Sequence, residues 1–223
     1  MKIKPTRLIL QCIMLLCFVM LFMTSYSQQQ ETTVKKAYAL ASAGPTTYGG
    51  VVSELGVQLV FKKNWVGTIS YQFLDMNPKN VPGDYNSGVT FILPIVPIPV
   101  GNGYPNTEMQ ILNFTAGKFF EASRRIWFTT EAGLSYVKGD KYTFAKQAVV
   151  SDIWSTSANY SKTKEVVSTV GVVLKADFNW AFCPVLGLGA GVFANLNSIQ
   201  SPVGFQLKLI GGWMHLKPKT KKS

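Results

Sequence analysis

Histidine and cysteine, on which many catalytic and metal sites depend, are nearly absent from this sequence. Its 223 residues include one histidine, His215, and three cysteines, of which Cys12 and Cys17 lie near the start. The third, Cys183, has no partner in the rest of the chain, which excludes a disulfide framework and a cysteine metal cluster. Neither a glycine-rich phosphate loop nor a group with metal-ligand spacing occurs, so no cofactor and no metal are expected.

Long apolar runs are also missing after the first segment. Residues 1–27 combine a basic start, an apolar stretch from Leu8 to Met23 and small residues at Ser25 and Ser27, the pattern of a secretory signal peptide. We predict cleavage after Ser27, because the apolar stretch is shorter than the ~20 residues of a spanning helix. With no later apolar helix, the remaining chain could span a membrane only as a closed β-barrel.

Acidic residues are few. The chain has 22 Lys and Arg against 11 Asp and Glu, and loss of Lys2, Lys4 and Arg7 with the signal peptide leaves 22 − 3 = 19 basic residues, a net charge of about +8. Export and the lack of a recognition motif argue against nucleic acid as a partner of this basic chain. Contact with anionic lipid, including lipopolysaccharide, or with acidic polysaccharide is expected instead.

Alternation of apolar and polar residues dominates the rest of the chain. Between Val167 and Leu196, two alternating runs flank the short connection Ala181 to Pro184. Period two predicts strands, because successive side chains point to opposite faces. One face is aliphatic and the other is polar or glycine, which is typical of a transmembrane hairpin, and each run reaches the ~9–11 residues needed to cross a bilayer.

The same alternation predicts seven clear strands and, by topology, an eighth. Outer-membrane barrels have short periplasmic turns, long external loops and an even number of strands, and here the long connections are 75–108 and 138–166. The weakly apolar Lys36 to Ala43 must then supply the missing first strand, and Gly44 to Gly50 is predicted as a turn. The clear strands are 51–62, 65–74, 109–120, 126–137, 167–180, 185–196 and 204–216.

Aromatic residues gather beside the short turns, where they predict a girdle at the periplasmic membrane interface. The alternative is that they are simply common in β proteins. On the opposite, inward faces of the strands lie charged residues of both signs. In a narrow barrel these charges should pair with one another as a structural network. An ion path through the barrel is the less favoured alternative. The predicted girdle is Phe61, Trp65, Phe120, Trp127, Trp180 and Trp213, and the predicted interior network is Glu54, Glu131, Lys175, Asp177 and Lys208.

Three segments carry a resemblance to a known family: Phe114 to Phe120 (FTAGKFF), Glu131 to Tyr136 (EAGLSY) and Gly187 to Asn197 (GLGAGVFANLN). With them, the chain after the signal peptide resembles the small eight-stranded outer-membrane β-barrels of Gram-negative bacteria, the OmpA- and OmpX-like outer membrane protein β-barrel domain. The resemblance implies a fold and a compartment, and little about activity. The lysine-rich end of this chain departs from the terminal aromatic residue of many such barrels.

Some barrels of this size are lipid-modifying enzymes, and the resemblance would then imply a histidine base near the external rim. The sole histidine, His215, falls at the periplasmic end of the last predicted strand, so no enzyme is expected. Catalysis by carboxylates alone stays open as an alternative. The loop carboxylates are Asp75, Asp84, Glu108, Asp140 and Asp152.

The external loops are the expected site of function. Val89 to Val100 is an apolar, proline-rich segment whose prolines exclude a helix and disfavour a central strand. It either covers the barrel mouth or the membrane interface, or binds a partner. In the second loop, aromatic residues such as Tyr142, Phe144, Trp154 and Tyr160 suggest that the strands continue above the membrane as a hairpin.

The sequence therefore predicts an all-β, eight-stranded antiparallel up-and-down transmembrane barrel in the cell outer membrane. The predicted divisions are a signal peptide at 1–27, the barrel at 28–216 and a basic periplasmic tail at 217–223. The expected role is non-enzymatic, structural or in surface interaction, by a monomer whose loops contact a surface protein or polysaccharide. The alternatives are a lipid-modifying barrel enzyme and a secreted soluble barrel that binds an apolar ligand.

Overall fold

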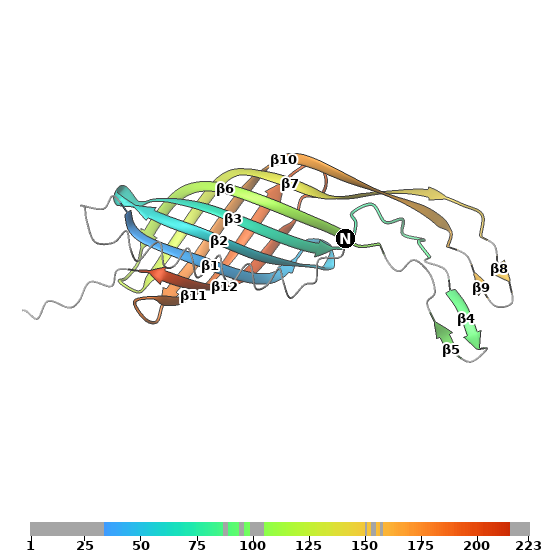
Figure 1. Ribbon diagram of the computed structural model, residues 1–223, viewed down its shortest axis with the longest axis horizontal. Helices are drawn as coiled ribbons and strands as arrows, with labels where there is room; N and C mark the ends of the chain where they lie inside the picture. Colours follow the sequence, from blue (N-terminus) through green and yellow to red (C-terminus); the bar gives the residue numbers. More distant parts are fainter. Residues whose placement is uncertain are drawn as a thin grey trace, which may run out of the picture.

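The computed structural model describes residues 34–86, 89–93, 96–98, 105–149, 151–152, 155–156 and 158–214. The predicted signal peptide, the basic tail and His215 lie outside these residues. Within these ranges there are twelve strands, and eight of them form one closed antiparallel ring in the order β1-β12-β11-β10-β7-β6-β3-β2 (Figure 1). The eight are β1 (Val34–Thr46), β2 (Gly50–Phe61), β3 (Trp65–Met76), β6 (Thr107–Glu121), β7 (Ile126–Lys146), β10 (Tyr160–Ala181), β11 (Leu186–Leu196) and β12 (Val203–Trp213). The predicted up-and-down barrel is confirmed.

The first strand, which local sequence indicated only weakly, closes the ring. β1 pairs with β2 along its length and with β12 from Ala37, opposite Trp213, to Thr46, opposite Gly204. It is longer than predicted, because Gly44 and Pro45 continue the strand instead of turning. A side chain at position 44 would place its Cβ 2.0 Å from the carbonyl oxygen of Phe205, so glycine is what permits this approach of β1 to β12.

The turn after β1 is correspondingly tighter than the predicted Gly44 to Gly50. A single 3-10 turn, η2 (Thr47–Gly49), connects β1 to β2, with Tyr48 and Gly49 at positive φ. A matching turn, η3 (Lys62–Asn64), connects β2 to β3 at the other end, with Lys63 and Asn64 at positive φ. Two residues with positive φ reverse the chain within three residues, which is what keeps adjacent strands in register.

Two strands extend well beyond the ring. β7 has 21 residues and β10 has 22, and their pairing continues from Trp180, opposite Ile126, to Tyr160, opposite Lys146. A bilayer needs only ~9–11 residues of a tilted strand, so about half of this hairpin projects past the membrane-crossing part (Figure 1). The extension predicted for the second loop is thus present.

The predicted loop 75–108 contains regular structure. β4 (Val89–Leu93) and β5 (Val96–Ile98) pair as a hairpin, and β4 also pairs with β9 (Ser155–Thr156), which pairs with β8 (Ser151–Asp152). Pro97 lies in β5, the edge strand of this small sheet, and edge strands are where proline is usually tolerated. The expectation that prolines disfavour a central strand agrees with this placement. The side chains of residues 89–100 lie outside the described set.

Candidate functional site: barrel interior and external hairpin

The inward faces of the ring strands meet in a polar layer at the middle of the barrel. All five predicted interior charges, Glu54, Glu131, Lys175, Asp177 and Lys208, are buried there, each at most 6% exposed. Period-two alternation explains this placement, because each residue lies on the face of its strand opposite the aliphatic one. Uncharged polar side chains complete the layer: Gln58, Thr68, Ser70, Gln72, Asn113, Thr115, Thr129, Ser135, Asn179, Asn195 and Gln206.

Four of the five charges form two ion pairs. Lys175 on β10 pairs with Glu54 on β2, across the barrel, and also donates to Ser70 Oγ at 2.9 Å. Lys208 on β12 pairs with Asp177 on β10 at 2.7 Å. Buried charges of opposite sign that also carry hydrogen bonds avoid most of the penalty of leaving water. The interior is therefore held by cross-strand pairs between segments far apart in sequence.

Glycines on β11 make the room that the second pair needs. A Cβ at position 191 would lie 1.9 Å from Asp177 Oδ1, and one at position 189 would lie 2.6 Å from Asn179 Oδ1. The alternating glycines of the GLGAG segment thus face inward opposite β10. Because they have no side chain, the polar side chains of β10 occupy the space beside them.

The fifth charge, Glu131, is held by uncharged donors. Gln58 Nε2 donates to one carboxylate oxygen and Thr115 Oγ1 to the other, the latter at 2.5 Å. Gln58 Oε1 in turn accepts from the Tyr38 hydroxyl, which accepts from Trp127 Nε1 at 3.1 Å. This chain of hydrogen bonds connects the charged layer with the end of the barrel at the short turns.

Trp127 is therefore misplaced in the predicted girdle. It is fully buried inside the barrel, where its ring lies 5.9 Å from that of Tyr38. The alternation of β7 already put Trp127 on the same face as Glu131, and proximity to a short turn was the weaker signal. Of the other predicted girdle residues, Trp65, Phe120 and Trp180 are 44–53% exposed on the outer wall, and Phe61 and Trp213 are partly buried.

Apolar layers lie on either side of the charged layer. At the short-turn end, Tyr38, Val60, Val66, Phe119, Trp127, Ala181, Ile210 and Met214 form one buried cluster. At the opposite end, Val52, Leu74, Met76, Met109, Ile111, Val137 and Phe193 form another. An eight-stranded barrel has an interior just wide enough for side chains, and these layers fill both ends of it. The polar layer is enclosed, which does not suit an aqueous solute path.

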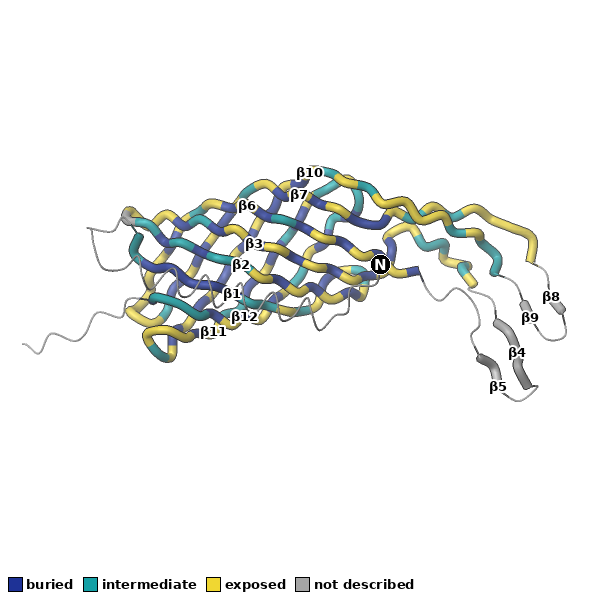
Figure 2. Tube along the Cα trace, in the orientation of Figure 1, coloured by how far each residue is buried: buried dark blue, intermediate teal, exposed yellow. Residues whose placement is uncertain are grey.

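The outer wall is apolar along the crossing part of every ring strand, and exposed residues alternate with buried ones along each strand in Figure 2. On β7 the apolar positions end at Tyr136, which is 51% exposed, and Lys138 follows on the same face. A continuous exposed apolar surface of this size does not occur on a water-soluble barrel. The chain is a transmembrane β-barrel, and the polar interior is the reverse of a barrel that encloses an apolar ligand.

Beyond the wall, one face of the β7–β10 hairpin carries lysines and aromatic rings. Lys146 lies opposite Tyr160, Lys162 opposite Phe144, and Lys164 opposite Tyr142, so all six share a face. We call these six residues, together with Lys138, the platform. Lys164 forms a 2.7 Å ion pair with Asp140, and that hydrogen-bonded carboxylate raises the pKa of Lys164.

The segment after β3, residues 77–86, packs against the platform and hydrogen-bonds to it. Tyr85 packs edge-on against Phe144 at 5.6 Å and stacks with Tyr160 at 6.4 Å. The Tyr160 hydroxyl donates to Asp84 Oδ1 at 2.8 Å, which lowers the pKa of the Asp84 carboxyl and raises that of Tyr160. Asn159 Nδ2 also donates to the Asp84 carbonyl oxygen at 2.5 Å. These contacts brace the hairpin outside the membrane.

The loop carboxylates considered for catalysis are partly brought together. Asp75 on β3 lies directly opposite Glu108 on β6, and the backbone N–H of Glu108 donates to Asp140 Oδ2 at 3.4 Å. Asp84 lies apart, on the platform. Spacing along the chain could not show this rim cluster, because its members meet only through strand pairing. Within the described ranges, no group of three or more His, Cys, Asp or Glu residues is arranged to hold a metal ion.

The same part of the chain has no helix that is long and apolar enough to cross a membrane. No known protein-family model matches the sequence, and no curated protein matches it.

Several solved structures are similar in fold, at low sequence identity. The attachment invasion locus protein Ail of Yersinia pestis shares 10% identity with a TM-score of 0.45, over 82% of this chain and 99% of Ail. Neisserial surface protein A shares 10% identity with a TM-score of 0.45, over 80% of this chain and 95% of that one. The N-terminal β-barrel domain of Pseudomonas aeruginosa OprF shares 7% identity with a TM-score of 0.44, over 80% and 98%. By its own closed ring, apolar wall and polar interior, the chain is a small eight-stranded membrane β-barrel of the outer-membrane type.

Proposed function

We propose that this protein is a non-enzymatic, monomeric outer-membrane barrel that binds acidic polysaccharide at the cell surface through the platform. The observation that carries the proposal is the paired extension of β7 and β10 about ten residues past the apolar wall. Strands that long are not needed to cross the membrane. A braced hairpin that presents side chains outside is the simplest use of them.

The chemistry of the platform suits a polyanionic sugar. Four lysines, Lys138, Lys146, Lys162 and Lys164, share a face with three aromatic rings, against the acidic neighbours Asp84 and Asp140. Ammonium groups bind phosphate or sulfate by charge-assisted hydrogen bonds. Tyr142, together with Tyr85 where it packs on Phe144 and Tyr160, offers flat apolar surface to a sugar. The anionic part of lipopolysaccharide or a sulfated polysaccharide of another cell has this character.

The enclosed interior supports a scaffold role for the barrel itself. The two ion pairs and the Glu131 hydrogen bonds occupy the polar layer, and apolar clusters lie at both ends. In the described part of the chain, Asp140 of the rim cluster binds Lys164 and the backbone N–H of Glu108, and neither is a histidine or a hydroxyl nucleophile. The described contacts of the rim carboxylates therefore do not form the acid–base or nucleophilic site that a lipid-modifying reaction would need.

Location is tested by comparing the outer-membrane fraction on a detergent gel with and without heating. A closed barrel resists the detergent until it is boiled, so we expect faster migration of the unheated protein. Recovery in the soluble periplasm with no mobility shift would overturn the membrane assignment.

Binding is tested with a size-defined heparin oligosaccharide, and with uncharged dextran as the reference ligand. Replacing Lys146 and Lys162 with Gln should weaken heparin binding at least tenfold and reduce its salt dependence, because two ion contacts are lost. The matched control is Lys63→Gln with Arg124→Gln, which removes the same charge at the opposite end of the barrel and should leave affinity within twofold. Equal losses in both double variants would refute binding at the platform.

A further inference from the structure

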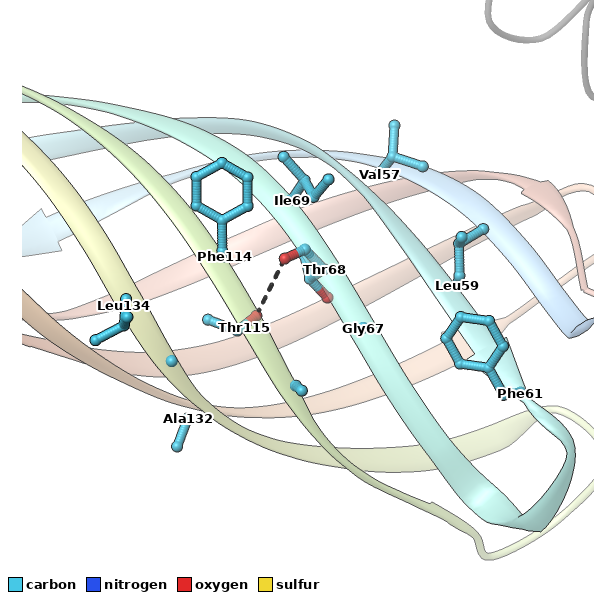
Figure 3. A pocket seen from close by; sticks show the side chains of 12 residues that line it. Val57, Leu59, Phe61, Gly67, Thr68, Ile69, Phe114, Thr115, Ala132 and Leu134 are labelled. Carbon is cyan, nitrogen blue, oxygen red and sulfur yellow. Dashed lines mark hydrogen bonds between the residues drawn. The ribbon is translucent and has the colours of Figure 1, made fainter.

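A groove crosses the outer wall over β2, β3, β6 and β7 (Figure 3). Its floor consists of small residues in register, since Gly67 lies opposite Ala116 and Ala116 lies opposite Ala132. Bulky side chains rise on either side, among them Phe61 and Phe114. The groove has a volume of about 500 Å³ and is almost wholly apolar.

The ammonium group of Lys118 lies beyond the end of the groove that faces the short turns. Trp65 and Lys118 are the next outward positions after Gly67 and Ala116, and they lie directly opposite one another. Lys118 Nζ lies 3.9 Å from the centre of the Trp65 ring. Tryptophan and lysine together are typical of the level where hydrocarbon meets head groups, with the lysine stem along the apolar wall.

The surroundings of Lys118 are strongly basic. Lys63, Arg124 and Arg125 are exposed at the same end, and Lys35 is half-buried there. Outside the barrel interior, Glu121 is the only acidic side chain among the described residues there, and it pairs with Lys35 at 2.6 Å. Such a rim attracts negative charge in the adjoining head-group layer.

We propose that this groove is a specific phospholipid site, in which one acyl chain lies over Gly67, Ala116 and Ala132 and an anionic head group binds Lys118. The lipid belongs to the leaflet at the short turns. A second copy of the barrel is the less suitable occupant, because it would enclose Lys118 in an apolar interface with no anion to pair it. A lipid phosphate supplies that anion and lets the wall stay in contact with hydrocarbon. This site is independent of the proposed function, since it lies at the other end of the molecule.

The wall contains a matched control. A second apolar groove of about 300 Å³ is lined by Phe128, Ala176, Phe178, Ala190 and Phe205 among others. The next outward pair toward the short turns, Trp180 opposite Leu188, is uncharged. It shares the small-residue floor and the bulky sides with the first groove and lacks the cation. Any retention of lipid that depends only on shape should occur at both grooves.

The test is native mass spectrometry of the refolded full-length mature chain, released from nanodiscs of palmitoyl-oleoyl phosphatidylglycerol or of the corresponding phosphatidylcholine. We expect one retained phosphatidylglycerol, at least fivefold more abundant than retained phosphatidylcholine. Lys118→Gln should abolish that preference, and Ala116→Leu should abolish retention by filling the floor. Lys63→Gln and Ala190→Leu should change neither.

Two results would overturn the proposal. Equal loss of preference in Lys118→Gln and Lys63→Gln would indicate diffuse attraction to a basic rim. Equal loss of retention in Ala116→Leu and Ala190→Leu would indicate ordinary boundary lipid, as would a dimer whose mass depends on Ala116. A measurement on the unaltered chain guards against variants that do not fold: a phosphatidylglycerol with a photoreactive acyl chain should label Phe114 or Leu134 in preference to Phe178 or Phe205. Even labelling of both grooves would likewise refute the site.

Discussion

The ion pair of Glu54 and Lys175 offers the sharpest test of how the barrel interior is stabilised. Replacing Lys175 with Met removes the cation but keeps an unbranched apolar side chain of similar length. Glu54 would then retain the hydrogen bond from Gln72 Nε2, at 3.1 Å, in a position that is 1% exposed. A buried carboxylate that keeps only the neutral donors Gln72 and Ser70 and the Coulombic attraction of Lys208 is poorly compensated for its lost hydration.

The expected loss is large. The side chains of Lys175 and Glu54 are 2% and 0% exposed, so bulk water screens neither. Removing one member of such a pair costs about 3–5 kcal/mol of unfolding free energy. The folding equilibrium should therefore fall by at least about 100-fold, because about 1.4 kcal/mol corresponds to a factor of ten.

The double variant separates pairing from packing. Glu54→Gln together with Lys175→Met removes both charges, and it should recover most of the stability because replacing a buried pair by uncharged groups is often neutral. The control is Lys35→Gln, which breaks the exposed pair with Glu121, whose members are 39% and 33% exposed, and should cost under about 1 kcal/mol. Glu121 itself is left unchanged because its other carboxylate oxygen lies 3.8 Å from Nζ of the buried Lys36.

Urea titration of the barrel in lipid vesicles, followed by the fraction that migrates fast without heating, measures the unaltered protein, Lys175→Met, Glu54→Gln, the double variant and the control. The reasoning is refuted if Lys175→Met costs no more than Lys35→Gln, or if the double variant loses the sum of the losses of Lys175→Met and Glu54→Gln. Additivity would mean that the two side chains act separately and that the interior charge is solvated.

Three further predictions follow from single contacts. Gly191→Ala should cost about 1–3 kcal/mol in the same urea titration, because the new Cβ would lie 1.9 Å from Asp177 Oδ1 and must displace its ion pair; an unchanged midpoint would contradict the interior clearance. Trp127→Phe should cost about 1–2 kcal/mol through the lost interior hydrogen bond, whereas the outward Trp180→Phe should cost less than half of that. The pKa of the Asp84 carboxyl is lowered in the folded state, so its hydrogen bond from Tyr160 contributes fully above about pH 4 and is lost as the pH falls through the folded pKa. Proteolysis of the 77–86 segment should therefore become faster only in that acidic range. If Tyr160→Phe showed the same acid-dependent increase, the link to this hydrogen bond would be refuted.

The sequence predicted the architecture because a membrane barrel imposes a strict repeat. Polar backbone groups in hydrocarbon must pair within a closed sheet, and side chains must alternate between lipid and interior. Alternation alone therefore indicated the seven clear strands, and the even-number rule promoted Lys36 to Ala43 to the eighth, which closes the ring with β12. The same alternation places the five interior charges, among them Glu54 and Lys175, on the inward faces of their strands.

The misplaced Trp127 marks where two sequence signals disagreed. Trp127 lies four residues from Glu131 in the same strand, so alternation placed both on the inward face. Its nearness to a short turn instead indicated the girdle. Near the end of a barrel both directions are apolar, so composition cannot choose between them. The hydrogen bond to Tyr38, a residue 89 positions away, decides it.

What the sequence by itself determined was the class of fold, the faces of its strands and the sign of its charge, because each follows from a local repeat or from composition. Only the tertiary structure decided which charges pair, that apolar layers enclose them, that β7 and β10 project as one braced hairpin, and that Gly67, Ala116 and Ala132 align beside Lys118. Those features depend on the register between strands. A one-residue slip would leave each strand's composition unchanged while turning its side chains to the other face, so register is fixed by the closed ring as a whole.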